Sequence, residues 1–426
     1  MLAGGGDSCS DIEVLRTQAR LFGAVPSDST LYRTVRALTP EIGAEVGAAF
    51  AAVRARVWDQ AGLVADDAPV VLDIDASLVQ IHSENKAGTG PTYKGGFGFH
   101  PMLCFADATG ETLGALLRPG NAGANSAADH LIVLDQALAQ LPAPIAAGHT
   151  VNADPAAVGR AVVVRADSAG ATRGFVDGCR ARNVGFAVGA RANAQIHSAI
   201  LQVLVEDRRW TPATRQDGSA RPGAAVCELT DLVHFPTWPT GTRLIVRREP
   251  LHPGAQQSLF PSTTHRYWAH YTDQAGAPVD LDRHMRAHAH VEDHIKRLKA
   301  SGLERFPFTN LAANEAWLAL VAMAADLVRW FQTLCLDGPL AGADPKRLRW
   351  QLWSTPGPYR APRRRRHHAV PRRLARRPGP PRRLPAHRRP HLTRRPALLP
   401  IRPGRRRTDA PRHPHRRPHH RSQTPP

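Results

Sequence analysis

Apolar residues at helical spacing mark the start of the chain. Ser10-Asp11-Ile12-Glu13 has the form of a capping box, and Thr39-Pro40 offers an N-cap followed by proline at the first helical position. Apolar side chains then share one helical face at Ile42, Val46, Ala49, Phe50, Val53 and Val57. The pattern predicts an amphipathic helix over about Pro40–Trp58, within a helical N-terminal region at residues 1–66.

From residue 67 to residue 190, short apolar runs of β type alternate with helical stretches. Strands are predicted at Val70–Ile74, Phe97–Ala106, Thr112–Leu117, Ala161–Ala166 and Gly185–Gly189. Helices are predicted at about Ser126–Gln140 and Gly170–Arg182. The cluster Gly95-Gly96-Phe97-Gly98 indicates a hairpin turn, because a nucleotide-binding loop would stand between a strand and a helix. We therefore expect residues 67–190 to form the first part of an α/β core.

Residues 191–262 have a different composition, rich in Arg, Pro and Gly, with one clear strand pattern at Thr242–Arg247. We interpret this stretch as a β-rich insertion. The core pattern resumes over residues 263–353, where a strand at His265–Tyr271 and a helix at His284–Lys299 are predicted. A long, mostly apolar helix at Ala313–Leu334 completes this last part of the core.

The net charge of +20 is concentrated after Trp353. Residues 354–426 contain 23 Arg, no Lys and one acidic residue, a balance of +22, so residues 1–353 are left with −2. This Arg/Pro/His-rich tail cannot form a packed core, and we expect it to be disordered. Arginine without lysine also suggests a GC-rich gene read in a shifted frame. The alternative is an arm that binds phosphates nonspecifically.

The five cysteines are scattered and form no C-x-x-C pair, which argues against both a disulfide framework and a structural zinc site. No N-terminal signal pattern is present, and the most apolar helical stretch is interrupted by Asp326 and Arg329. We therefore expect no membrane span and a cytoplasmic, nucleoid-associated location.

Two predicted buried strands end in aspartate. Asp75 closes the run that begins at Val70, and Asp167 closes the run Ala161–Ala166. A carboxylate at such a position is costly unless a cation or hydrogen-bond donors satisfy it. Because ligands bind outside the carboxyl ends of strands in open α/β sheets, the two acids could share a metal ion.

The helix predicted at His284–Lys299 carries a third acid. His288, Glu292, Lys296 and Lys299 fall along one stripe of it. A carboxylate and cations on one face suit phosphoryl transfer, but spacing alone favours a surface ion pair between Glu292 and Lys296. Zinc binding by the neighbouring histidines is disfavoured, because His290-Val291-Glu292-Asp293-His294 is not the H-E-x-x-H motif.

Several segments occur in the order found in one protein family. They are Leu72-Asp73-Ile74-Asp75-Ala76-Ser77, Tyr93 to Pro101, Leu117 to Asn121, Arg165-Ala166-Asp167-Ser168 and Glu292 followed by Ile295-Lys296-Arg297-Leu298-Lys299. Together they resemble bacterial insertion-sequence DDE transposases of the "transposase DDE domain, group 1" type. The resemblance covers about residues 7–353.

The resemblance implies an RNase H-like catalytic core with a β-rich insertion before the third acid. Asp75, Asp167 and Glu292 would be the catalytic and metal-binding trio for two Mg²⁺ ions, with Mn²⁺ as a substitute; Asp73 is a rival for the first position. Water would cut a strand at the element's end, and the freed 3′-OH would attack target DNA. The partners would be the element's terminal repeats, target DNA and a second copy of the chain in a synaptic complex.

The sequence departs from the family pattern in three places. Lys299 matches the expected lysine seven residues after the glutamate, but Met285 and His288 stand where a tyrosine and an arginine are expected. Phosphate binding would then pass to Arg286 or His288, beside Lys296 and Lys299. We expect the N-terminal segment that would recognise element ends to be absent, and the tail is unlike the family's helical C-terminus. A noncatalytic protein that binds DNA through the tail is the alternative function.

Overall fold

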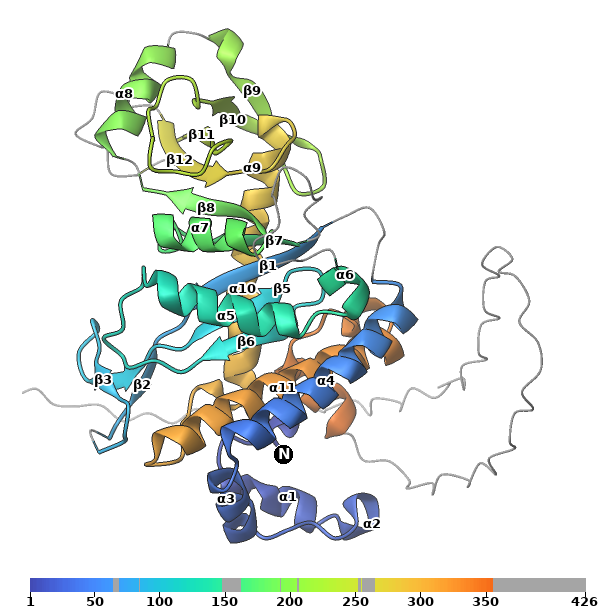
Figure 1. The fold of residues 1–426 in the computed structure, drawn as a ribbon. Coiled ribbons are helices and arrows are strands. Elements are labelled where there is room, and N and C mark those ends of the chain that lie inside the picture. Colours follow the sequence, from blue (N-terminus) through green and yellow to red (C-terminus); the bar gives the residue numbers. More distant parts are fainter. Residues whose placement is uncertain are drawn as a thin grey trace, which may run out of the picture. The chain divides into compact units, whose positions relative to one another are not determined.

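The computed structural model describes residues 1–63, 69–83, 85–147, 162–191, 193–204, 207–251, 254 and 265–354 (Figure 1). The described residues belong to one compact unit. The expectation of a disordered tail concerns residues outside this described part, apart from Ser354.

The N-terminal region is helical. It contains the short turns Leu2–Gly4 and Cys9–Ile12 and the helices α1 (Glu13–Arg16), α2 (Ala19–Phe22), α3 (Asp28–Arg36) and α4 (Pro40–Ala61). Thr39 caps α4 as predicted, since its side chain accepts a hydrogen bond from the Ile42 N–H and Pro40 follows it. The predicted capping box lies two residues earlier, because Asp11 accepts hydrogen bonds from the backbone N–H groups of Asp7 and Ser8.

The face that α4 turns to the core agrees with the predicted one only in part: Val57 is buried and Phe50 packs against the core, but the other large apolar residues of that face are exposed. Ile42, Val46 and Val53 are 42%, 42% and 45% exposed. The helix instead buries Arg54 and Trp58, and both donate hydrogen bonds to the buried carboxylate of Glu111. These buried polar contacts, which hydrophobic periodicity does not reveal, set the rotation of the helix.

One nine-stranded sheet runs through the described unit in the order β6-β5-β1-β7-β8-β12-β11-β10-β9. Its strands are β1 (Val70–Ala76), β5 (Met102–Ala106), β6 (Thr112–Leu116), β7 (Val162–Ala166), β8 (Gly185–Ala190), β9 (Thr211–Thr214), β10 (Ala220–Glu228), β11 (Arg243–Pro250) and β12 (His265–Thr272). Strands β1, β7 and β8 are parallel, and the other pairings are antiparallel. The fold is therefore a mixed α/β fold, as predicted.

A small second sheet contains β2 (Val79–Ile81), β4 (Phe97–Phe99) and β3 (Gly90–Pro91), in that order. The single strand predicted at Phe97–Ala106 is thus divided between β4 and β5. Pro101 lies at the division, where a residue without an N–H cannot donate to a sheet. Gly95 and Gly96 form the predicted hairpin turn between β3 and β4, both at positive φ.

Helices cover both faces of the large sheet. One face packs against α5 (Ala127–Ala139), α6 (Ala143–Ala147), α7 (Arg173–Ala181) and α8 (Ala194–Val203). Along β5 the side chains alternate between the two cores, with Met102 and Cys104 on this face and Leu103 and Phe105 on the other. The second core is closed by α10 (His290–Leu298) and α11 (Leu311–Cys335).

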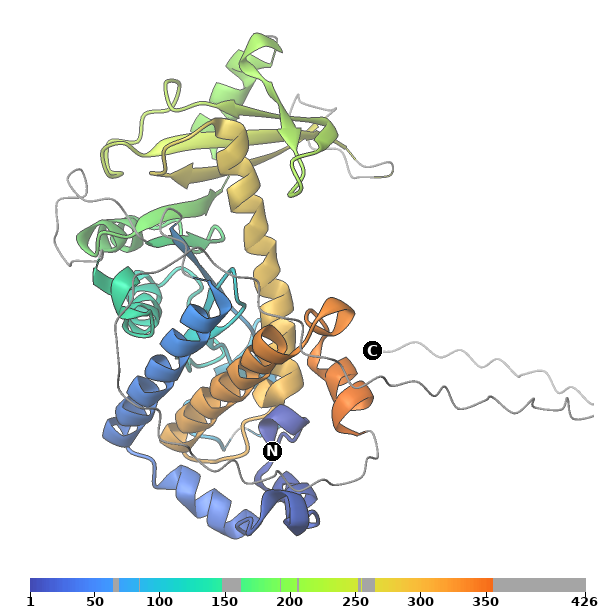
Figure 2. The ribbon, with the colours of Figure 1, turned by 90° about the vertical axis from the view of Figure 1, so that its right-hand side faces the viewer.

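The stretch predicted as a β-rich insertion supplies α8 and strands β9 to β11. These strands extend the large sheet through the pairing of β12 with β8, in which Ala269 faces Ala190. A helical column then returns along the other face of the sheet. It consists of α9 (Pro278–Arg286), a 3₁₀ turn (Ala287–Ala289), α10 and a wider turn (Lys299–Leu303), and Figure 2 shows it in yellow.

The described part ends with α11, a 3₁₀ turn (Gly338–Leu340), α12 (Pro345–Leu348) and a last wide turn (Arg349–Trp353). By length and composition alone α11 could cross a membrane, with a mean hydropathy of 1.5 over its most apolar window. Its packing accounts for that composition, because Trp317, Val321 and Val328 are buried in the fold. The buried carboxylate of Asp326 on the same helix pairs with Arg54.

Candidate active site

The parallel pairing of β1 with β7 brings the first two predicted acids to one place. Ile74 is in register with Ala166, so Asp75 on β1 and Asp167, directly after the end of β7, are the next residues of the two segments. Asp73 and Arg165 are in register two residues before them. Because side chains alternate along a strand, Asp73, Asp75 and Arg165 belong to the same face of the sheet, the one crossed by the helical column. Asp167 follows the strand and is exposed.

Asp73 is fully buried and fully engaged. Arg165 donates to both of its carboxylate oxygens, at 2.8 and 2.6 Å, and His288 Nδ1 lies 2.7 Å from Oδ1. Burial alone would raise the pKa of Asp73, but the hydrogen bonds from His288 and Arg165 lower it below its ordinary value. Asp73 is therefore a buried ion-pair partner, and its oxygens are poorly placed to ligate a metal.

Asp75 has a different environment. It is half-buried, and its Oδ1 accepts a 2.7 Å hydrogen bond from the backbone N–H of Ala76. Burial raises the pKa of its carboxyl group, and the negative charges of Asp167 and Glu292 raise it further, against the opposing effects of Ala76 and His288. The carboxylates of Asp167 and Glu292 therefore each lie close enough to Asp75 for their charges to act on it.

Glu292 is exposed on α10, one turn after His288. Within the described residues it forms no hydrogen bond or ion pair, so the surface pair with Lys296 that spacing favoured is not formed. Lys296 is exposed and Lys299 half-buried, and both line a groove of about 480 Å³ together with Glu292. Glu292 thus has no fixed partner within the described residues and lies near Lys296 of the same helix and Lys299 of the turn that follows it.

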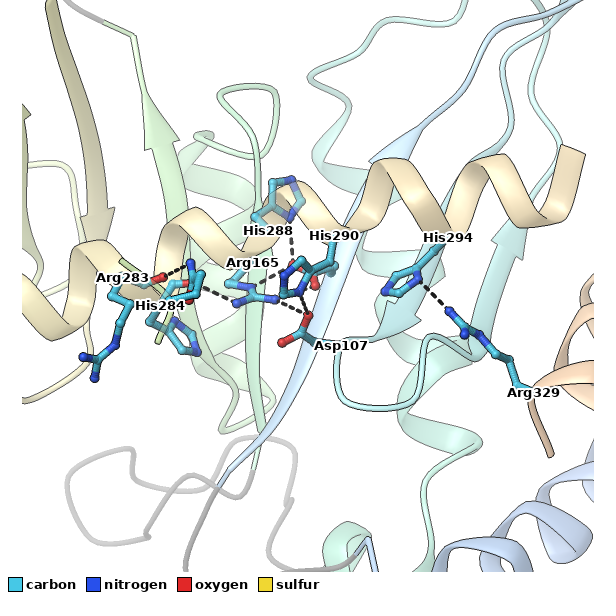
Figure 3. A network of polar contacts seen from close by, with 10 residues as sticks. Asp107, Arg165, Arg283, His284, His288, His290, His294 and Arg329 are labelled. Carbon is cyan, nitrogen blue, oxygen red and sulfur yellow. Dashed lines mark hydrogen bonds and ion pairs between the residues drawn. The ribbon is translucent and has the colours of Figure 1, made fainter. Parts of the chain in front are cut away.

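A polar network fixes the helical column over β1 and β7 (Figure 3). Arg165 donates to the backbone carbonyl of His284 at 2.7 Å and pairs with Asp107 at 3.0 Å. His290 Nδ1 lies 2.9 Å from the same Asp107 carboxylate. With the His288–Asp73 contact, these interactions hold the column on both sides of the turn that leads to Glu292.

The other predicted DNA-binding residues lie in a second groove, of about 410 Å³, which Asp167 also lines. Arg286 donates to Asp282 at 2.8 Å and to the carbonyl of Thr214, so its guanidinium is already engaged. His288 also lines this groove while it contacts Asp73. Their contact with DNA stays a prediction.

In the described part of the chain, no group of three His, Cys, Asp or Glu side chains lies close enough to hold a metal ion. The histidines of the column serve other contacts: His288 meets Asp73, His290 meets Asp107, and His294 lies beside Arg329 (Figure 3). Burial and then the charge of Arg329 lower the pKa of His294 to about 4. The trio of Asp75, Asp167 and Glu292 does fit a divalent cation chemically, since it offers oxygen ligands whose mutual repulsion a cation would relieve.

Sequence reasoning missed three residues of this site. Arg165 had a local signal, because a charge within the apolar run of β7 requires a buried partner. Asp107 and His290 had none, because their contact joins residues that are 183 positions apart. Only the folded arrangement brings them together.

The sequence of the chain matches the family "Transposase DDE domain group 1" over residues 1–372. The curated proteins gave no match. Among solved structures, one similar chain is from "Cryo-EM structure of piggyBac transposase synaptic complex with hairpin DNA (SNHP)", at 10% identity and a TM-score of 0.36. That match covers 66% of this chain and 51% of the other, so this chain spans only about half of that protein's length. Because the family match extends over most of the length of this chain, the chain belongs to the transposase DDE domain group 1 family.

Proposed function

We propose that this protein is a DNA transposase that cuts and joins DNA strands by metal-dependent phosphoryl transfer, with Asp75, Asp167 and Glu292 as its catalytic trio. Family membership supports the transposase function. The single observation that supports the trio is electrostatic: Asp75 is half-buried, and its pKa is raised by burial and by the charges of the other two acids. A bound cation would relieve the repulsion that the charges of Asp167 and Glu292 exert on Asp75.

The residues of the trio would hold two Mg²⁺ ions, or Mn²⁺ in their place. When bound, such ions lower the pKa of water, neutralise phosphate charge and stabilise the leaving oxygen. Asp75, on a central strand, provides the fixed ligand position. Asp167 and Glu292 bring further oxygens from β7 and α10. Lys296 and Lys299 attract the backbone of the strand that is cut.

In the proposed reaction, water first hydrolyses a strand at the end of the element, and the freed 3′-OH then attacks target DNA. The DNA partners are the terminal repeats and the target, bound by a homodimer in a synaptic complex, in the cytoplasm beside the nucleoid. We also propose that β6, β5, β1, β7 and β8, with α5 and α7, are the RNase H-like core. The positions of the first two acids on adjacent strands, with the third on a later helix, support this assignment.

A nicking assay tests the proposal. Duplexes carrying the sequences that flank the gene are incubated with the full chain in Mg²⁺ or Mn²⁺, and strand cleavage is measured. Asp75→Asn, Asp167→Asn and Glu292→Gln are each expected to lower the cleavage rate by at least about a hundredfold. Glu315→Gln, an exposed acid on α11, is the matched control and is expected to cleave normally. A trio variant that cleaves at the wild-type rate removes that residue from the site.

A further inference from the structure

The groove beside Glu292 continues beyond α10 onto the C-terminal part of the described chain. Besides Glu292, Lys296 and Lys299, its lining includes Lys346 of α12 and Arg349 of the last turn. With Arg297, five cationic residues from two segments about fifty positions apart in the sequence therefore line one groove with the third acid. We call it the C-terminal groove.

Other contacts already satisfy several of the acids that line the C-terminal groove. Asp344 accepts hydrogen bonds from the backbone N–H groups of Lys346 and Arg347, both at 3.0 Å, as the cap of α12. Asp7 pairs with Arg305 at 3.0 Å. In contrast, Lys296, Lys299 and Lys346 form no ion pair within the described residues. The groove thus presents lysine charges without fixed partners. Among the acids of its lining, Glu292 and Glu304 form no hydrogen bond or ion pair through their side chains within the described residues.

The backbone segment that carries Lys346 is held against the rest of the fold by hydrogen bonds and a buried side chain. Arg297 donates to the carbonyls of Gly342 and Ala343 at 2.8 and 2.9 Å. Leu348 is fully buried, and Arg349 donates to the carbonyl of Ala300 at 3.0 Å. The backbone N–H groups of Arg347 and Lys346 lower the pKa of Asp344, and the nearby charge of Lys296 lowers it further, so Lys296 of α10 lies near the residue that caps α12.

We propose that the C-terminal groove binds the phosphodiester backbone of the DNA strand that leads to Glu292, and that Lys346 contacts a phosphate there. This inference rests on the proposed function and extends it to residues outside the acidic motifs. A lysine contacts phosphates as a flexible point charge, which suits an open groove lined from two sides. Phosphate contacts position the duplex without reading its sequence, so Lys346 acts on every DNA equally.

Salt-dependent binding by the full chain tests the inference. Lys346→Ala is compared with Arg347→Ala, which removes the same charge from the neighbouring exposed residue, outside the groove lining. For Lys346→Ala we expect about threefold to tenfold weaker binding of any duplex and a salt slope smaller by about 0.9, the loss of one phosphate contact. Lys346→Glu should exceed that effect. Arg347→Ala should leave the slope at its wild-type value.

Two results would overturn the inference. If Lys346→Ala keeps the wild-type slope, the groove does not contact DNA. If the two alanine variants reduce the salt slope of DNA binding by the same amount, binding depends on the general charge of the surface and not on the groove. Strand cleavage separates this inference from the proposed function. If the wild-type chain binds DNA through Lys346 but never cleaves it, the proposed function is wrong and the inference about the groove stands. If cleavage depends on Glu292 but the Lys346 variants bind DNA normally, the inference about the groove is wrong and the proposed function stands.

Discussion

Two aspartates on one strand illustrate how neighbouring residues of the same type can have opposite effects on stability. Asp73 neutralises the buried guanidinium of Arg165, whose side chain is 1% exposed. Asp73→Asn removes this partner and leaves Arg165 with the ion pair to Asp107 at 3.0 Å, and we expect a loss of about 3 kcal/mol in the free energy of unfolding. Asp75 has no such partner, and its charge is opposed by burial and by two nearby acids. Asp75→Asn is therefore expected to stabilise the protein by about 1 kcal/mol at neutral pH.

Thermal unfolding of both variants without added metal measures the difference. The melting temperature should fall for Asp73→Asn and rise slightly for Asp75→Asn, while both lose strand cleavage. Val70→Ala, a change at the start of the same strand, controls for general effects on β1. A fall of equal size in both aspartate variants would mean that Asp75 is also a structural ion-pair partner.

Asp326 gives the second prediction at the residue scale. Burial, and then the charge of Glu111, raise its pKa to about 8 against the effect of Arg54. One guanidinium faces two buried carboxylates, so one of them carries a proton in the folded protein. The folded state keeps this proton to a higher pH than the unfolded chain does. Its stabilising contribution is therefore complete below pH 4 and is lost as the pH rises toward 8.

The melting temperatures of wild type and Asp326→Asn across pH 5 to 8.5 test this linkage. Asparagine cannot titrate. The difference in the free energy of unfolding between wild type and the variant should therefore shrink as the pH rises, by an amount on the order of a few kcal/mol, and the two melting temperatures should converge. Titration of groups that do not interact with Asp326 cancels in the difference between the two proteins. A constant difference across the range would show that Asp326 does not titrate there.

At the scale of elements, the helical column carries Glu292 across the sheet. The 3₁₀ turn Ala287–Ala289 carries His288, which contacts Asp73. It lies between His284, whose carbonyl accepts from Arg165, and His290, which contacts Asp107. Ala289→Gly loosens this turn and is expected to cost about 1 kcal/mol of stability. Cleavage should fall by about tenfold or more, because misplacing a catalytic group slows the reaction steeply.

Ala48→Gly provides the comparison, because Ala48 is exposed within α4 and far in sequence from the column. It should cost a similar free energy of unfolding and leave the cleavage rate unchanged. If both glycine variants reduce cleavage equally, the rate follows overall stability rather than the geometry of the column.

Elements with local signals were predictable from the sequence. The side chains of Thr39, Ser126 and Asn310 cap α4, α5 and α11, and each helix lies within a few residues of its predicted bounds. Strands were found where apolar runs are continuous, as in β7. The helix α8 was not predicted, because the Arg-, Pro- and Gly-rich composition around it favoured β structure.

Contacts between distant segments were not predictable. The strands of residues 191–262 continue the large sheet, and only the pairing of β12 with β8 determines this. At the site, motif order pointed to Asp75, Asp167 and Glu292, yet it left Asp73 as a rival. The ion pair with Arg165 separates Asp73 from Asp75, and strand register creates that pair. Periodicity carries no information about which strands become neighbours.

At the scale of the whole molecule, charge and catalytic residues belong to different parts of the chain. Residues 1–353 carry a net charge of −2, whereas the tail from residue 354 carries +22. The carboxylate trio lies in the compact unit, residues 1–360. Nonspecific attraction to DNA and phosphoryl transfer should therefore be separable by truncation.

Deleting residues 361–426 tests this separation. We expect the melting temperature to stay within about 2 °C of the full chain, because the compact unit keeps its own cores. Nonspecific DNA affinity and its salt slope should both fall, since most cationic groups are lost. Replacing the deleted arginines with glutamine in the full-length chain should reproduce the loss and show that charge, rather than length, is responsible. Retained cleavage at saturating DNA would place the chemistry in the compact unit, whereas loss of all cleavage would favour a protein whose only interaction with DNA is through its tail.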